Sequence, residues 1–212
     1  MRSTKALAVS GGVMMLASLT VAGAATGTSA TADNAPTVHT HTHLNSLNNS
    51  GVQGRASVES RGRWLNVHID ARGLAKGLPH AQHIHYGAEA AHECPTTAQD
   101  ADNDFRVTTA EGVPAYGPVR VSLTTRGDTS PGSALAVDRF PTANRGAEHY
   151  DRQTRTQRAV ARAIRRGEGV VVIHGVDYND NGKYDFSAGK SDLDPSLPAE
   201  ATDPATCGVL HR

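Results

Sequence analysis

Three histidines have the spacing expected of ligands to a single metal ion. His83 and His85 are two positions apart in residues 83–86, a short strand candidate. Side chains at positions i and i+2 of a strand project from the same face, so both imidazoles can reach one ion. His174 follows a β-branched run at 170–173, which predicts a buried strand, and is the best candidate for a third ligand from a neighbouring strand. Imidazole nitrogens suit copper and zinc.

Other histidines in the chain, which has eleven, offer alternative ligands. His39, His41 and His43 alternate just before the first expected strand and could capture copper or zinc near the mature N-terminus. A solvent-facing strand edge or tail is the interpretation we favour for them. His92 and His149 are spare candidates for a further copper ligand.

An acidic segment at residues 100–111 has the spacing of a calcium loop. Acids occupy positions 1, 3, 5 and 12 of the EF-hand pattern, namely Asp100, Asp102, Asp104 and Glu111. Phe105 stands at position 6, where glycine is usual, and the flanking residues look like loops rather than helices. The pattern predicts a lone EF-hand-like loop that binds calcium, and a solvated turn is the alternative.

A second segment, beginning at residue 177, repeats part of this pattern. Oxygen donors stand at positions 1, 3, 5 and 9, namely Asp177, Asn179, Asn181 and Asp185, and Gly182 has the expected place. Position 12 is Ala188, so Asp192 or Asp194 would have to complete the site. We expect a weaker calcium loop here, whose role is to order a long segment, or else an Asp/Asn turn.

The elements that must position these side chains are mostly strands. Expected strands cover residues 54–59, 64–71, 83–86, 119–124, 133–137, 170–173 and 207–210. Within 64–71, the side chains of Leu65, Val67, Ile69 and Ala71 share one face. Residues 150–166 lack glycine and proline and predict one helix, ended by Gly167.

The composition favours a single β-rich domain and excludes some functions. The chain has 212 residues, only 4% aromatic residues, 21 glycines and 10 prolines, which together predict many turns. Its formal net charge of zero argues against a general nucleic-acid-binding protein. Neither a Gly-x-Ser-x-Gly elbow nor a Walker loop is found, so nothing supports nucleophilic catalysis or nucleotide hydrolysis.

The first 32 residues predict a secretory signal peptide. Arg2 and Lys5 precede a mildly apolar run at 6–25, and small residues at 30 and 32 fit cleavage after Ala32. Cleavage after residue 24 or 25 is the alternative. We therefore expect a secreted protein without a membrane span, in which residues 33–44 form a histidine-containing N-terminal segment and 45–212 form the domain. Export makes a disulfide between Cys94 and Cys207 plausible.

Four motifs, in order along the chain, resemble those of the Cu/Zn superoxide dismutases. Gly-Leu-x-x-Gly-Leu at 73–78 followed by His-x-x-His-x-His at 80–85 is similar to the family's copper-ligand strand, and secreted CHRD-type domains carry a similar segment. Cys94 lies nine residues after His85, as the family's disulfide cysteine does. Residues 172–174 resemble the later strand with another copper ligand, and 207–210 resemble the C-terminal Cys-Gly-Val-Ile.

This resemblance spans about residues 45–210 and implies an all-β Greek-key sandwich or barrel of that type. It also implies that His83, His85 and His174 bind copper, that Cys94 pairs with Cys207, and that the protein takes part in superoxide metabolism. The expected ligands are therefore copper, calcium and superoxide.

The chain also departs from the family's pattern. The segment with the bridging histidine, Gly-Pro-His-Phe, and the zinc-loop ligands are not found, so zinc is doubtful, and whether a zinc ion accompanies copper stays open. Pro204 stands where the family has its active-site arginine. The alternative is a non-enzymatic, CHRD-like extracellular domain stabilised by calcium and one disulfide.

Overall fold

The computed structural model describes residues 35–212, and the expected signal peptide lies outside the described residues. The strands are β1 (Thr37–Ser46), β2 (Gln53–Arg61), β3 (Trp64–Arg72), β4 (Gln82–His85), β5 (Val119–Ser122), β6 (Ala147–Arg155), β7 (Val170–His174) and β8 (Pro204–Val209). The helices are α1 (Thr109–Tyr116), α2 (Arg158–Arg166) and α3 (Ala199–Thr202). None of the described helices combines the length and the apolar character needed to cross a membrane.

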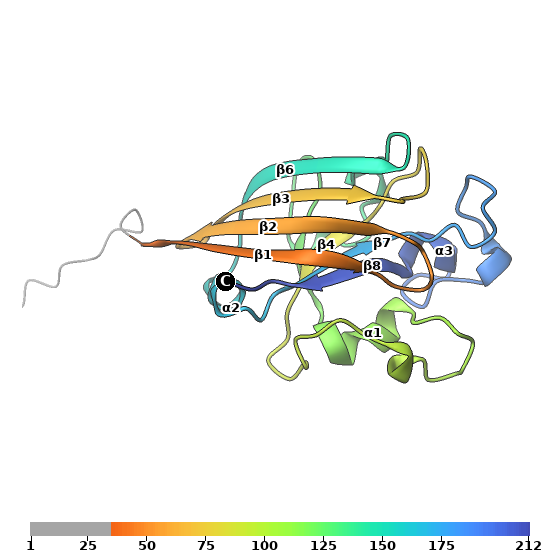
Figure 1. Ribbon diagram of the computed structural model, residues 1–212, viewed down its shortest axis with the longest axis horizontal. Coiled ribbons are helices and arrows are strands. Elements are labelled where there is room, and N and C mark those ends of the chain that lie inside the picture. Colours follow the sequence, from red (N-terminus) through yellow and green to blue (C-terminus); the bar gives the residue numbers. More distant parts are fainter. Residues whose placement is uncertain (1–34) are drawn as a thin grey trace, which may run out of the picture. The chain divides into compact units, whose positions relative to one another are not determined.

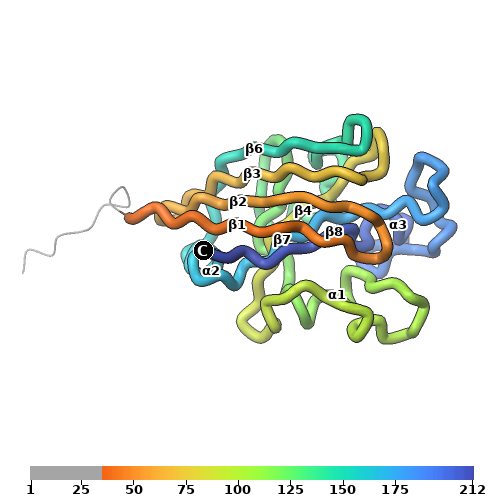
Figure 2. The backbone as a smooth tube through the Cα atoms, in the orientation of Figure 1, coloured from red at the N-terminus to blue at the C-terminus, as the bar shows by residue number. Residues whose placement is uncertain are grey.

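The eight strands are antiparallel and form one curled sheet with the order β5-β4-β7-β8-β1-β2-β3-β6 (Figure 1). The prediction of an all-β sandwich or barrel is confirmed. The sheet has two halves, joined where Asn45 and Ser46 of β1 pair with Cys207 and Thr206 of β8. The chain crosses between the halves after β3, after β5 and again after β6, in the manner of Greek-key folds (Figure 2).

The main core lies on the inner face of the curled sheet. Strand β3 shows the expected alternation, because Leu65, Val67 and Ile69 are at most 1% exposed and Ala71 is 6% exposed. From the other half, Ile84 of β4 packs in the same cluster. Burying a large aliphatic side chain stabilises the fold by roughly 1.5–3 kcal/mol, so this alternation holds the two halves together.

Strand β7 is buried on both faces. Val171 and Ile173 point into the main core, whereas Val170 and Val172 pack against Tyr116 and Cys207 on the opposite face. This second face is covered by the long connection that carries α1, seen beside β7 and β8 in Figure 2. Double burial explains why 170–173 is a continuous apolar run rather than an alternating one.

The expected helix at 150–166 is wrong in its first half. Residues up to Arg155 belong to β6, which pairs with all nine residues of β3, and α2 begins only at Arg158. Strand pairing with the edge of β3 outweighs the helical preference of this segment. The expected strand at 133–137 is also wrong, because short 3₁₀ turns flank it and Ser133 bonds to local groups instead of a ladder.

Strand β1 starts earlier than the expected beginning of the domain at residue 45. Residues from Thr37 pair with β2 over eight positions, so most of the histidine-containing segment is part of the sheet. The inward side chains are Thr40, Thr42 and Leu44, all buried. His39, His41 and His43 alternate with them and face solvent.

The expected disulfide between Cys94 and Cys207 is present, and it closes a loop across 113 positions. Cys207 lies on β8, opposite Val172 of β7, and Cys94 lies in the connection that leads to α1. The bond therefore ties this connection to the sheet.

Replacing both cysteines by alanine should lower the melting temperature by about 10 °C, because a loop of this length contributes about 4–5 kcal/mol in the chain-entropy model. Calorimetry on the variant, with thiol counting on the denatured wild-type protein, makes the measurement. Two free thiols in freshly purified, unreduced protein would contradict the bond.

Candidate metal centre

The three histidines predicted as ligands come together on the outer face of β4 and β7. His83 and His85 lie on β4, and His174 ends β7. The ring centroids are 5.1 Å apart for His83 and His174, 5.7 Å for His83 and His85, and 6.0 Å for His85 and His174. One ligand atom from each ring lies within 4.8 Å of the other two. We call these three residues the histidine cluster.

One nitrogen of each ring is held by a backbone carbonyl. His83 Nε2 donates to the carbonyl oxygen of Ala134 at 3.1 Å, and His85 Nδ1 donates to that of Gly117 at 2.8 Å. His174 Nδ1 donates to the carbonyl oxygen of Thr202 at 2.6 Å. A carbonyl accepts but cannot donate, so each bond fixes the tautomer of its ring. This is the usual way in which a metal-binding histidine is oriented.

The other nitrogen of each ring has no hydrogen-bond partner. His83 Nδ1, His85 Nε2 and His174 Nε2 are all buried, and the side chains are at most 4% exposed. Leaving a buried polar atom unpaired costs about 1–3 kcal/mol, and here three such atoms share one space. A bound cation would be coordinated by the lone pairs of these nitrogens, which would then no longer be unpaired.

Burial keeps all three rings neutral at pH 7. It lowers the pKa of His85 to about 3 and that of His174 to about 4, and it holds the pKa of His83 well below its usual value. A charge on His174 lowers the pKa of the other two rings further. Neutral imidazole is the form that binds a metal ion.

Aromatic side chains wall the histidine cluster. Phe140 lies edge-on to His83 at 5.4 Å, and Tyr116 lies 4.4 Å from His85, measured between ring centroids. Gly117, which supplies one carbonyl, has φ +85°, and a Cβ there would lie 2.5 Å from the backbone nitrogen of Gly87. Only glycine therefore lets the chain bring this carbonyl to His85.

His80 contacts the histidine cluster, a position that the sequence alone did not predict. It is fully buried, and its Nδ1 lies 2.8 Å from the carbonyl oxygen of His174. The hydroxyl of Tyr184 is 3.3 Å from both of its ring nitrogens. His80 thus helps to fix the backbone of a cluster member, and its place in the His-x-x-His-x-His motif is the signal that could have indicated this.

In the first acidic loop, the structure brings together three of the four predicted ligands. Oxygens of Asp100, Asp102 and Glu111 lie within 4.8 Å of one another. Asp104 is instead paired with Arg106, which also bonds to Asp203 at 3.0 Å. Glu111 lies in the first turn of α1, so the segment after the loop is helical, against expectation.

The two acidic loops have the same backbone hydrogen-bond pattern. Asp100 accepts the N–H groups of the residues four and five positions later, at 3.2 and 2.9 Å, and Asp177 does the same at 3.1 and 2.8 Å. At the sixth position of the pattern, Phe105 of the first loop has φ +67° and Gly182 of the second loop has φ +81°. Phe105 therefore adopts the left-handed conformation that the sixth position requires, at a cost that glycine avoids.

The second loop is completed by a residue that was not expected. Asp192 accepts the N–H of Ala110 at 2.6 Å, and Asp194 accepts that of Ser196, so neither bonds within the loop. Glu200, fully buried, accepts from the backbone of Asp185 at 2.7 Å and from the hydroxyl of Ser187 at 2.8 Å. Asp185 itself accepts the amide N–H of Asn181 at 2.7 Å, and the amide of Asn179 lies 3.5 Å from it.

The spare histidines lie elsewhere. The ring of His92 stacks on Tyr86 and donates to the carbonyl of Gly87 at 2.6 Å. His149 is on the exposed face of β6, beside Asp70. Neither joins the histidine cluster.

Comparison with known proteins does not identify a family for the chain, because no protein-family model and no curated protein matches it.

Acidification should destabilise the metal-free protein between about pH 6.5 and pH 4. Below pH 6.5 the unfolded chain protonates these three histidines, whereas the folded chain, with its lowered pKa values, does not. The unfolded state then binds more protons, so the free energy of unfolding falls as the pH falls, by about 1.4 kcal/mol per pH unit for each such ring.

Urea unfolding in the presence of chelator, repeated at several pH values, measures this slope. His85→Gln should reduce the slope, whereas His41→Gln, on the exposed face of β1, should leave it unchanged. Equal slopes for all three proteins would show that His85 is already protonated in the fold.

Proposed function

We propose that the protein is a secreted copper-binding protein whose histidine cluster holds the ion. The carrying observation is that three buried histidines come together, each with one unpartnered ring nitrogen, and that one ligand atom from each ring lies within 4.8 Å of the other two. The donors are all neutral nitrogens, a set that suits copper. Bound copper would supply a centre that exchanges one electron.

The chain's own residues prepare this site. The carbonyls of Ala134, Gly117 and Thr202 hold each ring in one tautomer and leave its other nitrogen without a partner. Phe140 and Tyr116 exclude water from the rings, so the protein rather than solvent decides what binds there. Rings held in advance lose little entropy when an ion enters.

Superoxide metabolism is the activity that the resemblance to Cu/Zn superoxide dismutases favours. The disulfide and the strands that carry the three histidines support that resemblance. Pro204 stands where the family has its active-site arginine, so this chain lacks at that position the cationic side chain that would attract superoxide. Copper binding is thus better supported than dismutation, and the alternative remains a non-enzymatic, CHRD-like extracellular domain.

The acidic loops are proposed to bind calcium in a structural role. Asp100 and Asp177 accept backbone N–H groups in the same pattern, and in the first loop oxygens of Asp100, Asp102 and Glu111 lie within 4.8 Å of one another. Hard oxygen donors suit calcium, and an ion there would order segments with few apolar residues.

The histidine cluster is tested by copper titration. Wild-type protein should bind one copper ion tightly per cluster, and His83→Ala/His85→Ala should lose that ion while its circular dichroism stays that of a folded protein. The matched control is His41→Ala/His43→Ala, which should keep it. If the first variant binds copper with unchanged stoichiometry and spectrum, the proposed site is wrong.

A xanthine-oxidase-coupled assay on the copper-loaded protein separates the two functions. Activity that disappears in His83→Ala/His85→Ala supports a dismutase. Tight copper binding without activity would remove superoxide from the proposal and leave a copper-binding extracellular domain.

Calcium should raise the melting temperature, because a ligand that binds only the folded state stabilises it by about 2.7 kcal/mol at 100 times its Kd. Glu111→Gln should blunt the rise, since the amide loses the charge and keeps an acceptor oxygen for only one of the N–H groups of Ala101 and Thr108. Glu59→Gln, on the outer face of β2, is the control. A melting temperature that responds neither to calcium nor to chelator would contradict calcium binding and show that both loops are solvated turns.

A further inference from the structure

The outer face of β1, β2, β3 and β6 carries ordered rows of imidazole and carboxylate groups. Strand register places residues side by side in one row of His43, Arg55, Asp70 and His149, and in the next row of His41, Ser57, His68 and Asp151. This face is separate from the histidine cluster, which lies on β4 and β7 in the other half of the sheet.

We propose that His68, Asp70 and His149 form a second metal site, on the protein surface, that takes a zinc ion. One ligand atom from each lies within 4.8 Å of the other two. Asp70 lies between the rings, with one oxygen 3.0 Å from His68 Nε2 and the other 2.7 Å from His149 Nδ1. We call these residues the outer-face cluster.

A fourth side chain orients one of the ligands. The carboxylate of Asp151 lies 3.5 Å from Nδ1 of His68, on the side of the ring away from Asp70. Without an ion, the Nε2–H of His68 donates to Asp70 at 3.0 Å. Zinc would displace this proton, and the nearby Asp151 carboxylate favours the tautomer in which the remaining proton sits on Nδ1. Carboxylate–histidine–metal arrangements use this order of groups, in which the outer carboxylate makes the imidazole a better ligand.

The charge of Asp70 also favours a cation. Its hydrogen bond to His149 is the main cause that lowers the pKa of Asp70, so the group is ionised at pH 7. Two imidazoles and one carboxylate are a common protein donor set for zinc, and they leave a fourth position open. The three ligands sit on two strands paired along their whole length, which holds them in place.

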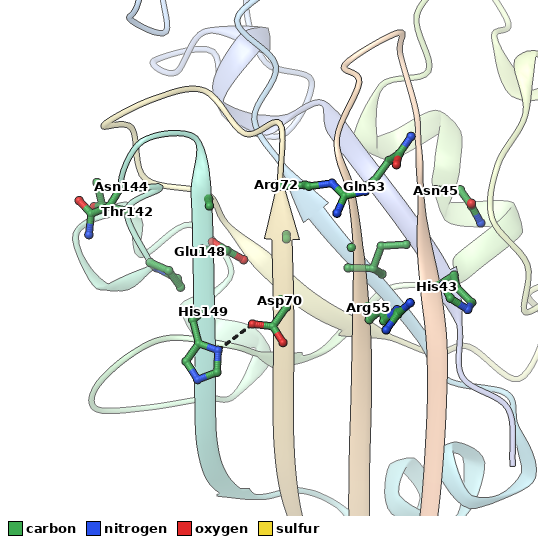
Figure 3. A pocket seen from close by; sticks show the side chains of 15 residues that line it. His43, Asn45, Gln53, Arg55, Asp70, Arg72, Thr142, Asn144, Glu148 and His149 are labelled. Atoms are coloured by element: carbon green, nitrogen blue, oxygen red, sulfur yellow. Dashed lines mark hydrogen bonds and ion pairs between the residues drawn. The ribbon is translucent and has the colours of Figure 1, made fainter.

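Two of the three residues of the outer-face cluster lie at the wall of a hollow of about 1020 Å³ (Figure 3). Asp70 and His149 line it, together with the guanidinium groups of Arg55 and Arg72. Water or a small anion can reach an ion at this wall, so zinc bound here should exchange readily, unlike an ion enclosed in the histidine cluster.

Zinc titration against a chromophoric chelator tests the site, using the mature protein with the His83→Ala/His85→Ala changes so that only surface sites can bind. This background should bind one zinc ion. Adding His68→Gln/His149→Gln should weaken binding at least tenfold, whereas adding His41→Gln/His43→Gln, on the same face, should not. Cobalt in place of zinc should give the visible absorption of a tetrahedral site, and the first pair of changes should abolish it.

His41, His43 and His149 are exposed and His68 is half-buried, so the added changes should leave the fold of the background protein intact, and melting curves check every variant, the background included. Zinc binding that is absent from the background protein overturns the proposal. Binding that survives His68→Gln/His149→Gln, or that is lost only with His41→Gln/His43→Gln, also overturns it and assigns zinc to another surface group. None of these outcomes bears on the copper proposal, because the background protein lacks that site.

Discussion

Three buried, neutral imidazole rings must each place one N–H on a hydrogen-bond acceptor. The long connections between the strands supply these acceptors, so the positions of the connections depend on the rings. Each neutral ring needs an acceptor for its remaining N–H, and the acceptors come from three separate connections, at Gly117, Ala134 and Thr202. A connection that moved away would leave a buried N–H unpaired, which costs about 1–3 kcal/mol. These hydrogen bonds therefore hold the rings in position and also hold the connections against the sheet.

The same constraint links the disulfide to the histidine cluster. Cys207 lies next to β7, which carries His174, and Cys94 starts the connection that leads to α1 and Gly117. Tyr116 packs against Val172 on one side and against the ring of His85 on another. The cross-link, the second apolar cluster and the histidine cluster thus form one packed unit on the outer face of β4, β7 and β8.

The sequence predicts those parts of the molecule whose side chains carry the signal. Alternation revealed β3, the double burial of β7 appeared as a continuous run, and the two-residue spacing placed His83 and His85 on one face. The carbonyl acceptors were not predictable, since every residue has one. The start of β1 was missed because its inward residues are mainly threonines. The outer-face cluster depends on pairing His68 and Asp70 with residues about 80 positions later, a register that only the folded sheet defines.

The two clusters differ in the charge of the ligands that they offer to an ion. This difference favours a different metal ion for each cluster. The histidine cluster is buried and its three donors are neutral, so an ion placed there gives up its hydration without an anionic ligand. The free energy needed to remove an ion from water rises steeply with the charge of the ion. Reduced copper carries a single charge, so its burial costs less than that of a divalent ion. The outer-face cluster is exposed and includes the ionised Asp70, which offsets the charge of a divalent ion that keeps part of its hydration. Ligand charge and ion charge agree if the buried cluster takes copper and the surface cluster takes zinc, and this agreement is why we propose a different metal for each.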